Sequence, residues 1–310
     1  MSFAIYLANT RGMCAGVRRA IEVVSQALEK YGRDRVYVLH EVVHNKHVVS
    51  ELREKGAHFV EQLSDIPDDR IVIFSAHGVP LSVIEQAAQR GLQVIDATCP
   101  LVKRIHRKMQ RAARSGQEAV VIGHRGHQEV IGTIGQYPGD PQLVHVVENA
   151  DDVARLQVRT DRLVFATQTT LSVDEAAHTV AALRARFPGI EGPQRDDTCF
   201  ATQLRQNAIK DLAAHCDLIL VVGSKNSSNS NRLAEVARHA GCEAHLIDDH
   251  SHLELAWLEG RRHVGISAGA SAPEYVVTEL IAFLQSIGGS RDIIGIGETE
   301  RNMTFPLPEI

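Results

Sequence analysis

Short apolar runs alternate along the chain with longer segments in which apolar residues recur every three or four positions. The runs, such as residues 71–74, 163–166 and 218–222, have the length of buried strands. The spacing of the apolar side chains predicts helices over residues 15–31, 100–115 and 200–214. Because strand, loop and helix alternate throughout, the pattern predicts an α/β fold built from parallel sheets with right-handed crossovers.

Three kinds of junction between strand and helix recur in the same order. The first carries a cysteine that opens one of these helices: Cys14, Cys99 and Cys199. The second is a strand that ends in a polar loop, and a gapless alignment places His44, His127 and Ser227 at one equivalent position. The third is a strand that ends in small or polar residues, followed by a helix whose first turn lies near Pro80, Ser172 or Pro273. Such internal periodicity indicates a repeated structural unit.

The repeat predicts three pseudo-equivalent α/β domains with small, mostly parallel sheets around a shared centre. The domains are expected at residues 1–92, 93–193 and 194–290, and residues 291–310 are expected to form a C-terminal tail that packs on them. Any α/β chain contains similar strand ends by chance, but the matched cysteine and His/Ser positions are harder to explain in that way. The repeat has one gap, because residues 190–195 lack the apolar strand that precedes Cys99.

The composition narrows the class of protein. With 310 residues, of which 44% are hydrophobic and 23% charged, the sequence is typical of a soluble globular protein of two or three domains. Its apolar runs are too short to span a membrane and residues 1–7 lack the features of a signal peptide, so we expect a cytoplasmic protein. A net charge of −5 with dispersed basic residues argues against nucleic-acid binding. Five widely spaced cysteines argue against a disulfide framework.

The three cysteines at helix starts are favourably placed for binding a metal. The helix dipole and the unpaired N–H groups stabilise a thiolate, the form that a soft metal requires. Three protein ligands leave one coordination position open, as in a catalytic zinc site or a 4Fe-4S cluster with one free iron, and all-thiolate ligation favours iron–sulfur. Three buried structural cysteines are the alternative. Cys216 and Cys242 have no partners in the repeat and are expected in the core.

Polar residues of the other two junctions would surround the open position. They are His44, His77, His127, Thr169, Ser227, Ser228, Asn229 and Ser271. Singly, each is more often a surface or core residue, but together their hydroxyl, amide and imidazole groups suit a phosphate or diphosphate. Residues 224–230 do not form a Walker A loop. Glu129 is the one carboxylate inside these junctions and the natural candidate for a proton donor.

Seven short segments carry a resemblance to a known family. They are residues 11–17 (RGMCAGV), 41–45 (EVVHN), 75–79 (SAHGV), 96–100 (DATCP), 167–172 (TQTTLS), 223–231 (GSKNSSNSN) and 268–273 (AGASAP). From residue 8 to about residue 275 the chain resembles the 4-hydroxy-3-methylbut-2-enyl diphosphate reductases, the last enzymes of the non-mevalonate isoprenoid route. It departs from the family pattern at Gln128, where a proline is usual, and at Ile131, where a glutamate is frequent.

The resemblance implies a three-domain fold around a central 4Fe-4S cluster, with Cys14, Cys99 and Cys199 as ligands and one iron open to the substrate. It implies that Glu129, Thr169 and His127 are catalytic and that Thr169 also belongs to the substrate site. It further implies that the diphosphate is held by His44, His77, His127, Ser227, Ser228, Asn229 and Ser271. The implied reaction is a two-electron reductive dehydroxylation of a small allylic diphosphate that yields isopentenyl and dimethylallyl diphosphates. Ferredoxin or flavodoxin is the implied electron donor.

The sequence leaves other functions open. A dehydratase similar to quinolinate synthase would also use one cysteine from each of three α/β domains, but its diagnostic motifs are absent from the sequence. A non-catalytic iron–sulfur sensor would not need Glu129 beside several hydrogen-bond donors that suit a phosphate. A zinc hydrolase is a third possibility.

Overall fold

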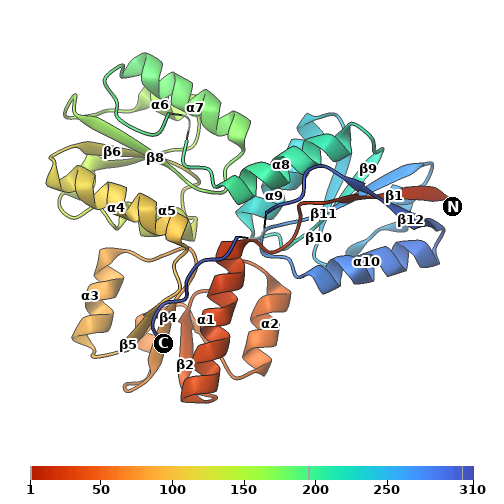
Figure 1. Cartoon of the computed structure of the whole chain (residues 1–310). Helices are drawn as coiled ribbons and strands as arrows, with labels where there is room; N and C mark the ends of the chain where they lie inside the picture. Colours follow the sequence, from red (N-terminus) through yellow and green to blue (C-terminus); the bar gives the residue numbers. More distant parts are fainter. Residues whose placement is uncertain (1, 195, 302) are drawn as a thin grey trace. The chain divides into compact units, whose positions relative to one another are not determined.

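The computed structural model describes residues 2–194, 196–301 and 303–310. Its internal contacts divide the chain into two compact units. Unit 1 comprises Met1–Val17, His44–Ser50 and Phe200–Thr304, and unit 2 comprises Arg18–Val43, Glu51–Cys199 and Phe305–Ile310. Both units alternate strands with helices (Figure 1). The predicted division into three domains at residues 92 and 193, with a tail from residue 291, stays a prediction.

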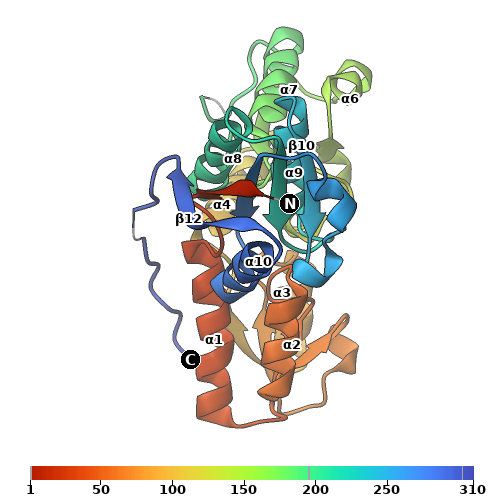
Figure 2. The same ribbon diagram turned by 90° about the vertical axis from the view of Figure 1, so that its right-hand side faces the viewer.

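Unit 1 contains a five-stranded parallel sheet in the order β10-β9-β11-β1-β12. Its strands are β1 (Phe3–Ala8), β9 (Leu218–Val222), β10 (Glu243–Ile247), β11 (His263–Ala268) and β12 (Gly289–Ile296). Side chains of β9 alternate between two cores: Ile219 packs with α8 (Phe200–Ala213) and α9 (Ser228–His239), whereas Leu220 packs with α10 (Glu274–Ser286). Helices therefore cover both faces of the sheet (Figure 2).

Unit 2 contains two smaller parallel sheets, in the orders β3-β2-β4-β5 and β7-β6-β8. The first is built from β2 (Val36–Leu39), β3 (His58–Val60), β4 (Ile71–Phe74) and β5 (Gln93–Asp96), and the second from β6 (Glu118–Ile122), β7 (Val144–Val147) and β8 (Leu163–Thr167). On the second sheet, α4 (Pro100–Arg114) and α5 (Gln128–Ile134) share one core, and α6 (Ala150–Arg155) and α7 (Val173–Arg186) share the other. The predicted fold class, an α/β protein with small parallel sheets, is confirmed.

The helices predicted after the three cysteines are confirmed almost to the residue. They are α1 (Ala15–Tyr31), α4 and α8. The start signals of the third junction are also confirmed, since Pro80, Ser172 and Pro273 are the N-cap residues of α3 (Leu81–Gln89), α7 and α10. The Ser172 hydroxyl caps α7 by accepting the Glu175 N–H. The helix α2 spans Lys46–Glu54.

The segment that leads to each cysteine pairs with a strand of the third junction. β5 pairs with β4 ahead of Cys99, and β1 pairs with β11 ahead of Cys14. Ahead of Cys199, the described residues 190–194 contain no full strand, and Glu191 instead forms a single parallel bridge to Val164 on β8. The gap in the sequence repeat therefore corresponds to a strand shortened to one bridge.

The last part of the chain begins as the strand β12, which is the edge of the unit 1 sheet beside β1. Further on, the final residues run along α1 in unit 2 (Figures 1 and 2), where the Pro306 carbonyl accepts a hydrogen bond from Arg19 and the Ile310 carbonyl one from Lys30. In the described part of the chain, no helix combines the length and the apolar character needed to cross a membrane. The expected cytoplasmic location stays a prediction.

Candidate functional site

Each of the three predicted cluster ligands directly precedes a helix and is half-buried: Cys14 before α1, Cys99 before α4 and Cys199 before α8. Each cysteine N–H also donates to a carbonyl in the loop after a third-junction strand. The acceptors are Ala270 for Cys14, Ala76 for Cys99 and Thr169 for Cys199, all at 3.0 Å. The three cysteines thus share one local backbone arrangement, as the repeat predicts.

Two of the cysteine loops are shaped by the same turn. Asp96 Oδ1 accepts the Thr98 N–H at 2.9 Å, and Asp196 Oδ1 accepts the Thr198 N–H at 2.6 Å. Burial acts to raise the pKa of Asp96, but hydrogen bonds from Lys103 and Thr98 outweigh it, so this pKa lies below its ordinary value. The Asp96 carboxylate therefore stays ionised. It holds the turn over residues 96–98, directly before Cys99.

In unit 1, the start of α9 gathers three of the predicted diphosphate ligands. Ser227 is the N-cap of α9, and its hydroxyl accepts the Ser230 N–H. Ser228 is the first residue of the helix, and the buried Asn229 accepts the Ala270 N–H through Oδ1 at 2.8 Å. Among the described residues, the Asn229 amide nitrogen has no hydrogen-bond partner. An unsatisfied buried donor at a helix N-terminus fits an anionic ligand.

Two further predicted ligands of unit 1 are joined directly. The Ser271 hydroxyl donates to the backbone carbonyl of His44 at 2.9 Å. Next to His44, the buried Asn45 caps α2, because its side-chain oxygen accepts the N–H groups of His47 and Val48 at 3.1 and 3.2 Å. The gapless alignment of His44 with His127 and Ser227 missed this residue, although an asparagine directly before a helix is a recognisable cap signal.

Unit 2 brings together the predicted catalytic residues. The Thr169 N–H donates to Glu129 Oε1 at 2.6 Å, and the Thr169 hydroxyl donates to Oε2 at 2.9 Å. Both side chains are buried, and Glu129 is only 3% exposed. Since the Thr169 carbonyl also accepts the Cys199 N–H, a continuous path of hydrogen bonds links the Glu129 carboxylate to the backbone of a predicted cluster ligand.

The two predicted histidines of unit 2 lie side by side. His127 is the N-cap of α5, and its Nδ1 accepts the Glu129 N–H at 3.1 Å. In the neutral ring this places the proton on Nε2, which makes that nitrogen a donor. The ring centroids of His77 and His127 are 5.9 Å apart, with the planes at 87°.

Close packing fixes the loop that carries His77. Gly78 has φ +78°, and a Cβ there would lie 2.3 Å from Cε1 of His106 on α4. A Cβ at Gly132 of α5 would in turn lie 3.1 Å from the Gly78 carbonyl group. Burial lowers the pKa of His106 to about 4, so its ring is neutral. Nothing in the sequence indicates the glycine and histidine contacts that hold His77 next to His127.

Comparison with known proteins fits this arrangement. The family described as LytB protein matches residues 5–285. The chain belongs to the LytB protein family. Curated LytB relatives include the 4-hydroxy-3-methylbut-2-enyl diphosphate reductases of Aeromonas salmonicida (strain A449), 55% identical over 98% of this chain and 97% of the relative, and of Azotobacter vinelandii, 54% identical over 98% and 97%.

Solved structures agree with the LytB family assignment. The E-1-hydroxy-2-methyl-but-2-enyl-4-diphosphate reductase from Plasmodium falciparum superposes with a TM-score of 0.94 at 36% identity, over 99% of this chain and 96% of that one. A structure of (E)-4-hydroxy-3-methyl-but-2-enyl diphosphate reductase, the terminal enzyme of the non-mevalonate pathway, gives 0.65 at 31% identity, over 92% and 99%. The predicted resemblance is confirmed.

The two residues at which the sequence is expected to depart from the LytB family pattern lie on α5. Gln128 is its first residue and Ile131 is 37% exposed. The helix nevertheless starts at its His127 cap, and Glu129 keeps both bonds to Thr169. Neither substitution disturbs the residues predicted to react.

The cysteines of this LytB family member divide into two chemical classes. Cys216 and Cys242 are buried core residues, as predicted, with burial raising the pKa of the Cys216 thiol to about 12. Cys14, Cys99 and Cys199 are half-buried at helix N-termini, which fits soft-metal ligation. Within the described residues, no three or more His, Cys, Asp or Glu side chains lie close enough together to bind one metal ion. The three-cysteine ligand set stays a prediction.

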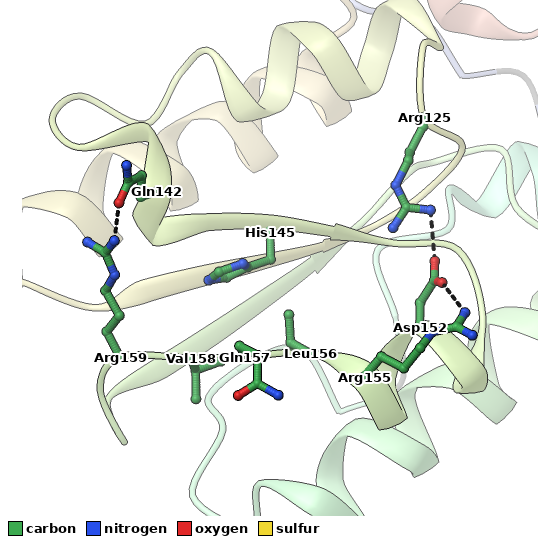
Figure 3. Close-up of a pocket in the computed structure, with 9 residues that line it drawn as sticks. All are labelled: Arg125, Gln142, His145, Asp152, Arg155, Leu156, Gln157, Val158 and Arg159. Atoms are coloured by element: carbon green, nitrogen blue, oxygen red, sulfur yellow. Dashed lines mark hydrogen bonds and ion pairs between the residues drawn. The ribbon is translucent and has the colours of Figure 1, made fainter.

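A pocket of unit 2 lies apart from these residues, at the outer edge of β7 (Figure 3). It has a volume of about 530 Å³ and is lined by Arg125, Gln142, His145, Asp152, Arg155, Leu156, Gln157, Val158 and Arg159. Its three arginines are paired with Asp152 or Asp140. None of the lining residues was predicted to bind substrate or cluster.

Proposed function

We propose that this LytB family member is a 4-hydroxy-3-methylbut-2-enyl diphosphate reductase, an oxidoreductase of isoprenoid biosynthesis. It converts its substrate to isopentenyl and dimethylallyl diphosphates. The observation that carries this function is the match to curated reductases at 51–55% identity across 98% of the chain. The buried Glu129–Thr169 pair and the donors at the start of α9 give the chemistry a structural basis.

The reaction breaks one C–O bond and consumes two electrons and two protons. One proton leaves with the hydroxyl oxygen as water, and the other is added to either end of the allyl unit, which gives the two products. Ferredoxin or flavodoxin is the electron donor we propose. When bound, a 4Fe-4S cluster supplies the electrons and one iron that polarises the C–O bond. Cys14, Cys99 and Cys199 would hold it.

The proton chemistry falls to unit 2. Glu129 is the one acid among the proposed catalytic residues, and its two oxygens are oriented by the Thr169 N–H and hydroxyl. In its protonated form it can donate to the departing hydroxyl, and Thr169 can pass a proton on to it because the hydroxyl both donates and accepts. His127 caps the start of α5, because its Nδ1 accepts the Glu129 N–H. Its Nε2–H is a further donor.

The diphosphate is held by neutral donors and helix N-termini. In unit 1 these are His44, Ser227, Ser228, Asn229 and Ser271. In unit 2 they are His77 and His127. The buried Asn229 amide supports this assignment most directly, since leaving such a donor unpaired costs about 1–3 kcal/mol that a phosphate oxygen would recover.

The other functions considered are not favoured. The family match covers residues 5–285 and names neither a dehydratase nor a sensor. A zinc hydrolase would not reduce its substrate, whereas the curated relatives are named reductases.

The decisive experiment is an anaerobic absorption and paramagnetic-resonance spectrum of the purified chain, with and without 4-hydroxy-3-methylbut-2-enyl diphosphate. We expect an iron–sulfur signal that changes when the substrate is added, and product formation once the protein is reduced. Zinc in place of iron and sulfide, or a loaded protein that does not reduce the substrate, would refute the proposal.

A further inference from the structure

A buried arginine of α1 contacts the loop of a cysteine far along the chain. Arg19 lies just over one turn after Cys14 and is 7% exposed. Its Nη1 donates to the carbonyls of Ala97 and Thr98, at 3.1 and 3.3 Å. Those are the two residues that precede Cys99. The cation on the helix of one cysteine therefore holds the loop of the next.

The helix that begins after Cys99 repeats this arrangement. Lys108 on α4 bonds both carboxylate oxygens of Asp197, at 2.9 and 2.7 Å, and the Asp197 side chain is 2% exposed. Asp197 lies two residues before Cys199. Its peptide is also tied to β8, because its N–H donates to the Thr167 hydroxyl at 2.7 Å and its carboxylate accepts the Thr167 N–H at 3.1 Å.

The helix that begins after Cys199 completes the series. Arg205 on α8 is fully buried, and its Nε and Nη2 both donate to the carbonyl of Gly12, at 3.0 and 2.7 Å. Gly12 lies two residues before Cys14 and has φ +65°. The same guanidinium bonds the Glu300 carboxylate at 2.9 Å.

We propose that Arg19, Lys108 and Arg205 are positioning residues that set the three cysteine loops for cluster binding. The inference rests on the proposed function, because it gives the loops a cluster to hold. Taken in order, the helix after Cys14 supports the Cys99 loop, the helix after Cys99 supports the Cys199 loop, and the helix after Cys199 supports the Cys14 loop.

Ordinary core packing does not account for this pattern. Arg19 and Arg205 are the only buried arginines in the described ranges 2–194, 196–301 and 303–310, and both bond the backbone within two residues of a proposed ligand. Burying a cation is costly unless it is fully hydrogen-bonded. A charged donor on a carbonyl also fixes the peptide ahead of the cysteine, which restricts where the thiolate can lie.

Lys108→Met is the sharpest test, because Lys108 is less buried than the two arginines and methionine keeps an unbranched apolar chain only one atom shorter. Its matched control is Arg107→Met, at the neighbouring exposed position of α4. The full chain is loaded anaerobically with iron and sulfide. Iron loss to a chelator, the paramagnetic-resonance spectrum of the reduced cluster and the thermal unfolding midpoint are then measured on each variant.

We expect Lys108→Met to hold iron roughly 10- to 100-fold less well than Arg107→Met at temperatures well below the unfolding midpoint of either variant, with a changed spectrum. Lys108→Arg should restore retention, and Asp197→Asn should reproduce the loss. Arg19→Lys, which keeps the charge, provides a second variant if Lys108→Met does not fold, and it should show the same loss because one ammonium cannot reproduce the guanidinium contacts.

Three results would overturn the inference. Lys108→Met could retain iron as well as its control, its iron loss could follow a general fall in the unfolding midpoint, or Lys108→Arg could fail to restore retention. Failure of the proposed function is recognised separately, because it is read from the wild type alone: a wild-type chain that takes up no iron and sulfide has no cluster to position.

Discussion

Replacing Glu129 by glutamine isolates the proton from the shape of the side chain. In the wild type the Thr169 N–H donates to Glu129 Oε1 at 2.6 Å, and the glutamine amide oxygen can still accept it. The glutamine amide nitrogen can donate to the Thr169 hydroxyl, which in the wild type donates to Glu129 Oε2. The buried geometry is kept, but the side chain can no longer give up a proton. Any loss of rate then measures the acid itself.

The size of the loss follows from the chemistry of general acids. A positioned general acid contributes about 10²- to 10⁴-fold to a rate, which corresponds to roughly 3–5 kcal/mol of transition-state stabilisation. We expect Glu129→Gln to retain its cluster and its substrate-dependent spectral change while single-turnover reduction slows by that factor. An effect on binding alone would instead raise KM and leave the single-turnover rate at saturation unchanged.

The assay mixes chemically reduced, cluster-loaded protein with the substrate under anaerobic conditions and follows both products by mass spectrometry. Glu85→Gln on the exposed surface of α3 is the matched control, since it makes the same chemical change away from the proposed site. If Glu129→Gln reduces its substrate within a few-fold of the control rate, Glu129 is not the proton donor, and Thr169 or His127 has to supply the proton by another path.

Three further predictions concern the cluster, the diphosphate and the pH. Replacing Cys14, Cys99 or Cys199 by alanine should abolish cluster binding while Cys216→Ala leaves it intact, and full iron content in a Cys99 variant would contradict the three-ligand set. Asn229→Asp keeps the acceptor for the Ala270 N–H but removes the buried donor, so substrate titrations should show binding weakened by about 1.5–3 kcal/mol or more; unchanged binding would exclude a contact with the diphosphate. Since burial lowers the pKa of His106 from 6.5 to about 4, the folded chain binds fewer protons than the unfolded chain between these values, and the free energy of unfolding should fall by up to about 3 kcal/mol as the pH drops through this range. Urea unfolding at several pH values should show this slope in the wild type and a smaller one in His106→Gln, and equal slopes would refute the assignment.

Local patterns in the sequence predicted the helices and strands well, because both are encoded by nearby residues. The helices after Cys14, Cys99 and Cys199 begin where the repeat places them. The pairing of Glu129 with Thr169 as a catalytic set came instead from motif resemblance. That resemblance placed these residues in one site, and the structure gives their hydrogen bonds.

Long-range pairing was not predictable in the same way. Nothing near Phe3–Ala8 in the sequence indicates that this strand joins β11 and β12, because strand partners are chosen by surfaces that come from distant parts of the chain. The contacts of Arg19 and Arg205 were not predictable either. Arginines on helices are mostly exposed, so nothing in the sequence indicates that these two are buried. Asn45 stands directly before α2 in the sequence, where a cap is expected. The gapless alignment instead matched its neighbour His44 to His127 and Ser227, so the Asn45 cap was overlooked.

The position of β1 in the unit 1 sheet also has a consequence for biosynthesis. β1 is made long before β11 and β12, between which it lies, so this sheet cannot close until translation has reached about residue 296. The two sheets of unit 2 draw their strands from neighbouring stretches and can form while the ribosome is still at work. The strand β1, with the Cys14 segment behind it, therefore has to wait for its partners until β12 has been made.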